Sequence, residues 1–398
     1  MMNHRCAWAD NGLAIIDTGG TVFPCCQIRG EHGKNTVNNY PNISRLKTLD
    51  EVHDSNSFRT IRKKLKTGHN HECSSCWHIE KAGKTSRRQY FSASEFYTGG
   101  YGLKFMELML DSTCNMMCKM CKPTQSSKWA SAKKLLSDLD MIDTSNEGHH
   151  VMTGSSVIKN LINVLENTDL SKLVHINIVG GEPFYSKNFL KILKLLDEKR
   201  GLENISIGLN TNASIFPNDE LLKLLVSTKT IRIKFSLDAV GNLASYIRHG
   251  MPWDLIENNV KKFTKLRKTY SNMSFIISST VSVMNMNHMQ DLADFAYDNG
   301  LAIDSYMLEH PKYFSIYNIP IDERKKYLID KTKRNYNSFI HSWADEFNNQ
   351  MLYERNWVKT GLSMPILNTL DKHQNSNFAE TNPEMYSTLL KLAKKQKI

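Results

Sequence analysis

Three cysteines at the spacing C-x3-C-x2-C constrain this chain more than any other feature of its sequence. Cys114, Cys118 and Cys121 follow an apolar run at residues 103–110, which predicts a buried strand. A loop of this length can turn three thiolates toward one centre. A structural zinc ion takes four protein ligands, and a [4Fe–4S] cluster usually takes four cysteines. Three cysteines therefore leave one metal position open, which is the condition for chemistry at the metal.

The composition is that of a folded chain without a membrane span. Its 398 residues are enough for one large α/β domain with smaller additions. No run of 18 apolar residues is present, and residues 1–6 lack the apolar core of a signal peptide. We therefore expect a cytoplasmic protein with no membrane partner and with reduced cysteines. All eight cysteines lie in the first third of the chain, which favours metal sites over a disulfide scaffold.

The net charge of +11 comes from the two ends of the chain. Residues 1–100 and residues 311–398 each hold 14 Lys and Arg against 9 Asp and Glu, and the centre is almost neutral. A basic surface can bind nucleic acid or an acidic substrate, and it can equally keep a protein in solution. The charge alone therefore assigns no partner.

Residues 101–310 alternate short apolar runs with amphipathic stretches, which predicts βα units and a parallel sheet. Strands are expected at residues 103–110, 174–179, 205–210, 231–237, 275–283 and 302–308. Functional groups of such sheets collect where the strands end. The candidate residues after the second to fifth strands are Gly180, Gly181, Glu182, Pro183, Asn210, Asn212, Ser236, Asp238, Arg248 and Asn285.

This order of motifs resembles the radical S-adenosylmethionine (SAM) superfamily. In that family three cysteines hold a [4Fe–4S] cluster whose fourth iron is chelated by SAM. The resemblance implies a (β/α)6 partial TIM barrel at residues 101–310, with the three cysteines as cluster ligands. Gly180 to Pro183 are similar to the family's GGEP element, so Glu182 would accept a hydrogen bond from the SAM amino group. The other strand-end residues would contact the rest of SAM, with Arg248 as a partner for its carboxylate. Turn formation and helix capping are the simpler roles for such residues.

The resemblance also implies a reaction. An electron from the reduced cluster cleaves SAM to methionine and a 5′-deoxyadenosyl radical, which abstracts hydrogen from the substrate. The electron would come from a low-potential donor of the flavodoxin or ferredoxin type. The substrate is not identified. A peptide or protein is one class, and a sugar, nucleoside or other small metabolite stays open.

Residues 1–100 carry a second set of cysteines. Cys6, Cys25, Cys73 and Cys76 resemble the auxiliary-cluster part of SPASM and twitch modules, here placed ahead of the barrel. The resemblance implies one auxiliary [4Fe–4S] cluster with a closed shell of four thiolates. A zinc knuckle fits the same spacing. Cys26 is the odd cysteine, and it could replace Cys25 as ligand or be a buried thiol.

Two alternative uses of the cysteines remain open. The three-cysteine loop could bind zinc with a fourth ligand such as His149 or His150, although a solvated insertion at residues 140–154 is the simpler interpretation of these histidines. A zinc-dependent nucleic-acid-binding protein is the alternative of another class.

Residues 311–398 are expected to form a helical extension, with a charged helix over residues 322–350. The side chains expected to enter the core from this helix are Tyr327, Phe339, Trp343 and Phe347.

Overall fold

A mostly parallel sheet of eight strands runs through the part of the chain that the structure describes. The computed structural model describes residues 6–17, 19–28, 40–68, 71–81, 83–93, 102–139, 156–250, 252–354 and 363–395. The strand order is β2-β1-β3-β4-β5-β6-β7-β8. The strands are β1 (Gly12–Ile15), β2 (Val22–Phe23), β3 (Phe105–Met109), β4 (His175–Val179), β5 (Ser206–Thr211), β6 (Thr230–Ser236), β7 (Met273–Val281) and β8 (Ala302–Met307). All six predicted strands are confirmed, and their ends differ from the prediction by at most two residues.

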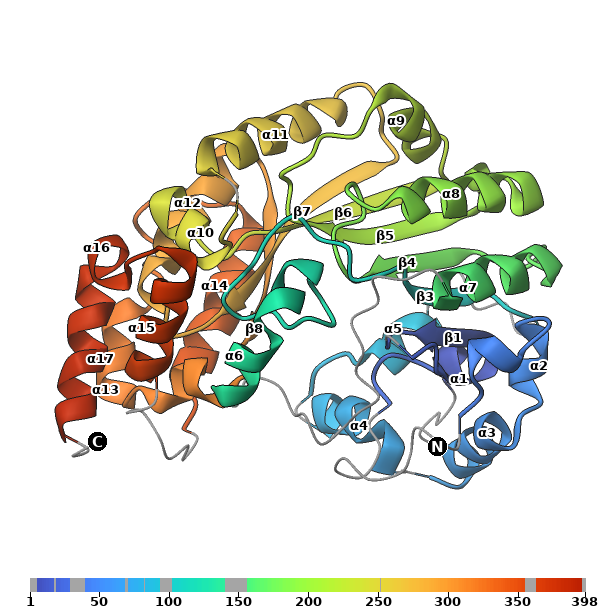
Figure 1. Cartoon of the computed structure of the whole chain (residues 1–398), viewed down its shortest axis with the longest axis horizontal. Helices are drawn as coiled ribbons and strands as arrows, with labels where there is room; N and C mark the ends of the chain where they lie inside the picture. Colours follow the sequence, from blue (N-terminus) through green and yellow to red (C-terminus); the bar gives the residue numbers. More distant parts are fainter. Residues whose placement is uncertain are drawn as a thin grey trace.

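Helices cover the outer side of the sheet and gather at both ends of the chain. In Figure 1, α8, α9 and α11 lie along one side of the sheet, the N-terminal helices surround β1, and the C-terminal helices lie at the opposite end. The helices are α1 (Ala7–Asn11), α2 (Asp50–His53), α3 (Asn56–Thr67), α4 (Ser74–Lys81), α5 (Arg87–Ala93), α6 (Lys133–Asp138), α7 (Ser156–Asn167), α8 (Lys187–Arg200), α9 (Asp219–Val226), α10 (Gly241–Ile247), α11 (Trp253–Leu266), α12 (Met289–Asp298), α13 (Ile321–Arg324), α14 (Ser338–Met351), α15 (Ser363–Gln374), α16 (Phe378–Thr381) and α17 (Pro383–Lys395).

The two faces of the sheet differ in polarity because side chains alternate along each strand. On the outer face, one row of paired residues is apolar and buried throughout: Leu108, Ile178, Leu209, Ile233 and Phe275. On the inner face, the neighbouring row is Glu107, Asn177, Gly208, Arg232 and Ser274. The helices therefore pack on the apolar face, and the concave face of the partial barrel is polar.

The N-terminal hairpin belongs to the same sheet as the core. β1 and β2 pair antiparallel. β1 also pairs in parallel with β3, so that Ile15 lies opposite Leu108 and extends the buried apolar row. The first residues thus add two strands to the six of the predicted barrel. The division into units at residues 1–100, 101–310 and 311–398 stays a prediction.

The C-terminal region is helical, but the predicted continuous helix over residues 322–350 is wrong. Residues 328–337 contain no helix, because Asp330 accepts a hydrogen bond from the Thr332 amide (2.9 Å) and forms a local turn. Asn337 then caps α14 by accepting a bond from the Ile340 amide (3.0 Å). Phe339 is 71 % exposed, because the buried stripe of α14 begins one residue later.

No helix in the described ranges is both long and apolar enough to cross a membrane.

Candidate functional site

The cysteine loop leaves the C-terminal end of β3 and is held by the segment that follows α10. The Met117 amide donates to the His249 carbonyl oxygen (2.7 Å), and the Lys119 amide donates to that of Ile247 (2.9 Å). The loop is thus fixed at two alternate residues to the end of α10 and the segment after it. This arrangement orders the loop without using the thiols, which stay available as ligands.

Asp111 anchors the beginning of the loop, a role that the sequence analysis missed. Its carboxylate is buried and accepts bonds from the Thr113 amide (2.8 Å), the Ser186 hydroxyl (2.6 Å) and the Asn188 side-chain amide (2.8 Å). Ser186 in turn caps α8 by accepting a bond from the Asn188 amide (3.2 Å). The loop after β3 and the helix after β4 therefore share one polar anchor.

Gly180 and Gly181 bring the turn after β4 against the backbone of the cysteine loop. Their φ angles are +82° and +48°, a region that side chains other than glycine rarely adopt. A Cβ atom on Gly181 would lie 2.4 Å from the Thr113 carbonyl oxygen, and one on Gly180 would lie 2.5 Å from a Met109 side-chain carbon. A larger side chain at either position would collide with the cysteine loop or with the end of β3, so both positions require glycine. Pro183 is buried in the same turn.

Glu182 is almost completely buried and ties this turn to the end of β5. Its carboxylate accepts bonds from the Thr211 hydroxyl (2.7 Å), the Asn212 amide (2.6 Å) and the Phe184 amide (3.1 Å). Burial raises the pKa of Glu182 to about 7, although these hydrogen bonds act to lower it. The helix cap that offered a simpler role for Glu182 comes instead from Ser186.

Asn212 connects the end of β5 to the cysteine loop. Its side-chain amide donates to the Asn115 side chain (2.9 Å) and lies 4.0 Å from the Cys114 sulfur. The side-chain oxygen of Asn212 accepts a hydrogen bond from the Ser214 hydroxyl (2.6 Å), and the Asn115 side-chain amide donates to the same hydroxyl (2.9 Å). Asn210, two residues earlier, is exposed on the inner face of the sheet. Asn212 is therefore at the cysteines, and Asn210 faces the concave side.

Asp238 and Arg248 form a buried ion pair beside the cysteines. Arg248 Nε lies 2.8 Å from Asp238 Oδ2, in a geometry that falls short of a hydrogen bond. Burial lowers the pKa of Arg248, but Asp238 and the thiols of Cys118 and Cys121 raise it above its ordinary value. The Thr280 amide donates to Asp238 Oδ1 (2.7 Å) and fixes the carboxylate to β7. The guanidinium thus lies near two of the three cysteines.

Asn285 and Ser236 lie at the ends of β7 and β6. The Asn285 amide group donates to the carbonyl oxygens of Asp238 (2.6 Å) and Thr280 (3.1 Å), and its oxygen accepts from the Ser282 amide (2.8 Å). Direct contact between Asn285 and SAM, which the sequence predicts, would break these bonds. Ser236 is the last residue of β6 and is half-buried. The roles of both residues stay predictions.

The N-terminal cysteines gather where the N-terminal helices meet the sheet. Cys6, Cys25 and Cys73 pack in an apolar cluster that includes Trp8, and Cys76 lies close enough to Cys6 to act on the pKa of its thiol. Burial raises the pKa of Cys6 to about 11. The Cys26 thiol is instead placed beside Glu107 and Arg87. This placement favours Cys25 over Cys26 as a ligand, and the assignment stays a prediction.

The donor set suits a metal cluster. None of the eight cysteines, which all lie within the described ranges, forms a disulfide. Burial raises the pKa of Cys114 to about 11, so its thiolate form needs the positive charge of a metal. Among the described residues, no three His, Cys, Asp or Glu side chains are arranged as a ready site for a metal ion. His149 and His150 lie outside the described residues, and all ligand assignments stay predictions.

The inner face of the sheet carries charged and polar groups on β6 and β8. Lys234 on β6 pairs with Asp304 on β8 (3.0 Å), and the Tyr306 hydroxyl donates to the same carboxylate (2.8 Å). Arg232 is exposed on this face, and Tyr306 is 57 % exposed. These groups can bind a polar molecule laid across β6 to β8.

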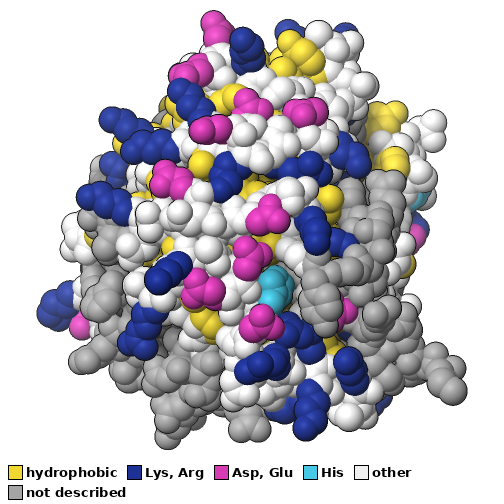
Figure 2. Space-filling view, turned by 90° about the vertical axis from the view of Figure 1, so that its right-hand side faces the viewer, with side chains coloured by type: hydrophobic (Ala, Val, Ile, Leu, Met, Phe, Trp, Pro, Cys, Tyr) yellow, Lys and Arg dark blue, Asp and Glu magenta, His cyan; other side chains and the backbone are white. Residues whose placement is uncertain are grey.

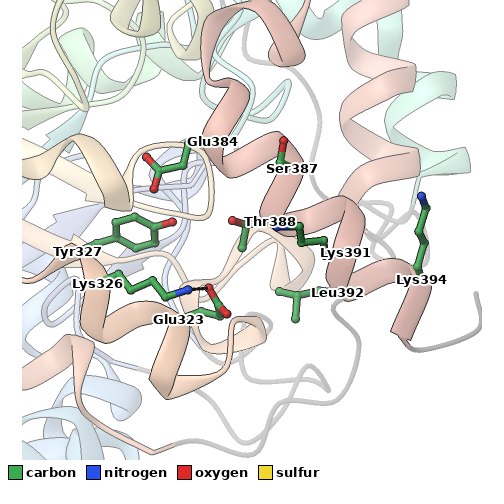
Figure 3. A pocket seen from close by; sticks show the side chains of 9 residues that line it. All are labelled: Glu323, Lys326, Tyr327, Glu384, Ser387, Thr388, Lys391, Leu392 and Lys394. Atoms are coloured by element: carbon green, nitrogen blue, oxygen red, sulfur yellow. Dashed lines mark hydrogen bonds and ion pairs between the residues drawn. The ribbon is translucent and has the colours of Figure 1, made fainter.

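A cavity of about 470 Å³ lies away from these residues, between α17 and the segment of α13 and Lys325–Tyr327 (Figure 3). Its wall includes the ion pair of Lys326 and Glu323 (2.6 Å). No cysteine and no candidate residue lines it. This cavity therefore has no part in the candidate site.

Comparison with known proteins finds two family matches. A model of the Radical SAM superfamily matches residues 112–296, and a model of an iron-sulfur cluster-binding domain matches residues 6–77. The two matches together cover more than half of the chain. No curated protein matches the chain.

Solved structures also show similarity. Streptococcus suis SuiB bound to S-adenosylmethionine is 14% identical over 62% of this chain and 48% of that chain, with a TM-score of 0.34. The structure of anSMEcpe with bound AdoMet and Cp18Cys peptide is 17% identical over 63% and 62%, with a TM-score of 0.38. SuiB bound to the precursor peptide SuiA is 14% identical over 81% and 60%, with a TM-score of 0.33. The chain thus spans 48–62% of the length of these proteins.

Proposed function

This chain belongs to the radical SAM superfamily and carries an iron–sulfur cluster-binding domain ahead of its core, and we propose that it modifies a peptide by hydrogen abstraction. It is an enzyme that uses [4Fe–4S] clusters and S-adenosylmethionine, and it needs a reductant. The cluster and SAM together supply a 5′-deoxyadenosyl radical. The chain's own residues bind SAM and the substrate, orient them and keep water out.

One observation carries the assignment of the site. The three cysteines, Glu182 and Asn212 come from the ends of three neighbouring strands, Arg248 comes from the end of α10, and these residues are linked to one another around the cysteine loop. In this proposal Cys114, Cys118 and Cys121 hold the SAM-binding cluster. Buried Glu182 accepts the ammonium group of SAM, and Arg248 faces its carboxylate.

The N-terminal cysteines would hold the second cluster. Cys6, Cys25, Cys73 and Cys76 supply four thiolates, which close the coordination shell and suit electron transfer. Trp8 and Phe91 belong to the same buried apolar cluster as Cys6, which shields this thiol from water. We propose a flavodoxin or ferredoxin as the electron donor, and the cytoplasm as a compartment that keeps these thiols reduced.

The inner face supports a peptide as the substrate. Its exposed groups, from Arg232 on β6 to Tyr306 on β8, extend across several strands. A site for a small metabolite is usually an enclosed cavity with few polar groups. Exposed polar groups spread over three strands instead suit an extended chain whose amides and side chains bind at several points. Sugars and nucleosides remain the competing substrates in the test below.

The zinc-dependent nucleic-acid-binding alternative finds less support. It does not account for the family match over residues 112–296. On the face shown in Figure 2, Lys and Arg are interspersed with Asp and Glu and do not form a patch of one sign. Binding to phosphate backbones requires such a patch.

Substrate-dependent cleavage of SAM tests the peptide proposal. Reduced holoenzyme is incubated with SAM and with pools of peptides, sugars or nucleosides, and 5′-deoxyadenosine is measured. We expect a peptide pool to raise its rate of formation above the substrate-free rate. Replacement Arg232→Ala should weaken this response while the substrate-free rate stays unchanged. Stimulation by sugars or nucleosides alone would exclude the peptide.

A further inference from the structure

Lys119 lies inside the cysteine loop, yet its side chain is bound by the C-terminal helix α15. Its side chain is fully buried, with 0% exposed. The ammonium group donates to Asp371 (2.8 Å), Gln374 (2.7 Å) and Ser376 (3.0 Å), and it lies 4.1 Å from the centre of the Tyr246 ring. All three donor hydrogens are therefore used by the end of α15 and the residues just after it.

The same part of α15 also holds the backbone of the loop. The Gln374 side-chain amide donates to the Met117 carbonyl oxygen (2.7 Å). The Trp129 indole donates to the Cys118 carbonyl oxygen (3.0 Å), and its ring stacks on His373 at 5.9 Å. Gln374 contacts the loop directly and His373 contacts it through Trp129, and both lie beyond position 296, where both family matches have ended.

The buried charge of Lys119 depends on this contact. A buried cation is tolerated only where a counter-ion and hydrogen bonds replace its water. Asp371 supplies the counter-ion, and its second oxygen accepts a bond from the Phe378 amide (2.8 Å). Phe378 also stacks on Tyr246 at 5.3 Å. If α15 moves away, the Lys119 ammonium loses its counter-ion, and the backbone of the loop loses the bond from Gln374 to Met117.

We propose that α15 supports the cluster-binding loop from outside the barrel, with Lys119 as the positioning residue that couples the two. The inference rests on the proposed function in one respect, because it takes the loop to hold the SAM-binding cluster. The C-terminal extension thereby gains a role in cluster retention and in the placement of SAM. Lys119 itself touches neither substrate nor reacting atoms.

Iron release from the holoenzyme to a ferrous chelator tests the coupling. Two cluster sites should give two kinetic phases of iron release. The phase that reports on the loop is the one that disappears when Cys114, Cys118 and Cys121 are all replaced by alanine. Variants Lys119→Met and Gln374→Met should speed this phase, by roughly tenfold for Lys119→Met, since groups in one network are strongly coupled. Gln374→Met keeps the ion pair and should have the smaller effect. The second phase, from the N-terminal cysteines, should stay unchanged.

Arg324→Met is the matched control for loss of C-terminal stability. Arg324 is buried in the same region, and it donates to the carbonyl oxygens of Ile319 (2.9 Å) and Tyr353 (3.1 Å). This variant should lower Tm and leave the loop phase of iron release unchanged. Equal acceleration by Arg324→Met would overturn the proposal, as would release at the wild-type rate in both loop variants.

Hydrogen exchange of the loop separates this inference from the proposed function. Amides of residues 112–127 should exchange faster in Lys119→Met and Gln374→Met than in wild-type protein, whether or not iron is bound. A wild-type protein that takes up no iron would refute the proposed function, and the exchange result would still decide the coupling. Unchanged exchange in both variants would overturn the coupling alone.

Discussion

The main-chain amide of Glu182 donates a hydrogen bond of 2.8 Å to the carbonyl oxygen of Thr113. This bond joins the turn after β4 to the loop that carries the three cysteines. It forms only because Gly180 and Gly181 let the two backbones approach closely. The candidate SAM ligand and the candidate cluster ligands are therefore positioned by one backbone contact.

A methyl group on Gly181 should push this contact apart. Gly181→Ala places a Cβ atom 2.4 Å from the Thr113 carbonyl oxygen, so the loop or the turn must move. We expect the variant to retain less iron at the three-cysteine site. Gly241→Ala is the matched control, because its φ is also positive (+61°) but no atom lies within 4 Å of the added carbon. Both variants should lose about 1–2 kcal/mol to backbone strain, and only Gly181→Ala should lose iron. Equal iron content in the two variants would contradict the role of the contact.

Replacement Glu182→Gln should weaken SAM binding. A buried carboxylate beside an ammonium group contributes about 1.5–3 kcal/mol, so affinity should fall roughly 10- to 100-fold. Iron content should stay near the wild-type value, because Glu182 is not a cluster ligand. Anaerobic SAM titration followed by the EPR signal of the cluster measures the effect, with exposed Glu198→Gln as control. Wild-type affinity in Glu182→Gln would remove this residue from the SAM site.

His53 should make the protein less stable in acid. Burial lowers its pKa from 6.5 to about 4, and its ring nitrogens have no hydrogen-bond partner among the described residues. The unfolded chain therefore binds a proton below about pH 6.5 that the folded protein accepts only near pH 4. The stability that neutral His53 provides above pH 6.5 is lost as the pH falls through this window. We expect the free energy of unfolding, measured with urea at several pH values, to fall between pH 6.5 and pH 4 by about 1–3 kcal/mol less in His53→Phe than in wild-type protein. If wild-type protein and His53→Phe show the same pH profile, folding does not lower the pKa of His53.

Iron analysis separates the two proposed clusters. Protein reconstituted without oxygen should hold close to eight irons if each site binds a [4Fe–4S] cluster. Replacing Cys114, Cys118 and Cys121 by alanine should leave about four, because Cys6, Cys25, Cys73 and Cys76 remain. Stoichiometric zinc without iron in anaerobically purified protein would contradict both assignments.

The strands could be predicted from sequence because each forms a local apolar run bounded by turn residues. The order of the motifs then placed Glu182 and Asn212 at the same edge of the sheet as the cysteines. The parallel pairing of β1 with β3 could not be predicted, because it joins short segments about 90 residues apart that carry no shared pattern. The same holds for Lys119 and Asp371, which are 252 residues apart.

Other site contacts were missed for a different reason. Asp111 and Thr211 are residue types that form turns and caps everywhere, so their sequence context gives no sign that they position the site. Only the structure brings the Thr211 hydroxyl to Glu182. Conversely, the candidate role of Asn285 came from its position after β7, whereas its amide is used by the backbone around it. Strand-end position identifies the edge of the site, and side-chain direction decides which residues face the ligand.

The central claim is that the loop of Cys114, Cys118 and Cys121 holds a cluster that cleaves S-adenosylmethionine. The most direct test is to add a strong reductant and SAM to anaerobically reconstituted protein and to measure 5′-deoxyadenosine and methionine. The account predicts both products in equal amounts from wild-type protein and neither from the variant with all three cysteines replaced by alanine. A wild-type protein that holds a full complement of iron and forms no 5′-deoxyadenosine would contradict it, as would undiminished cleavage by the variant.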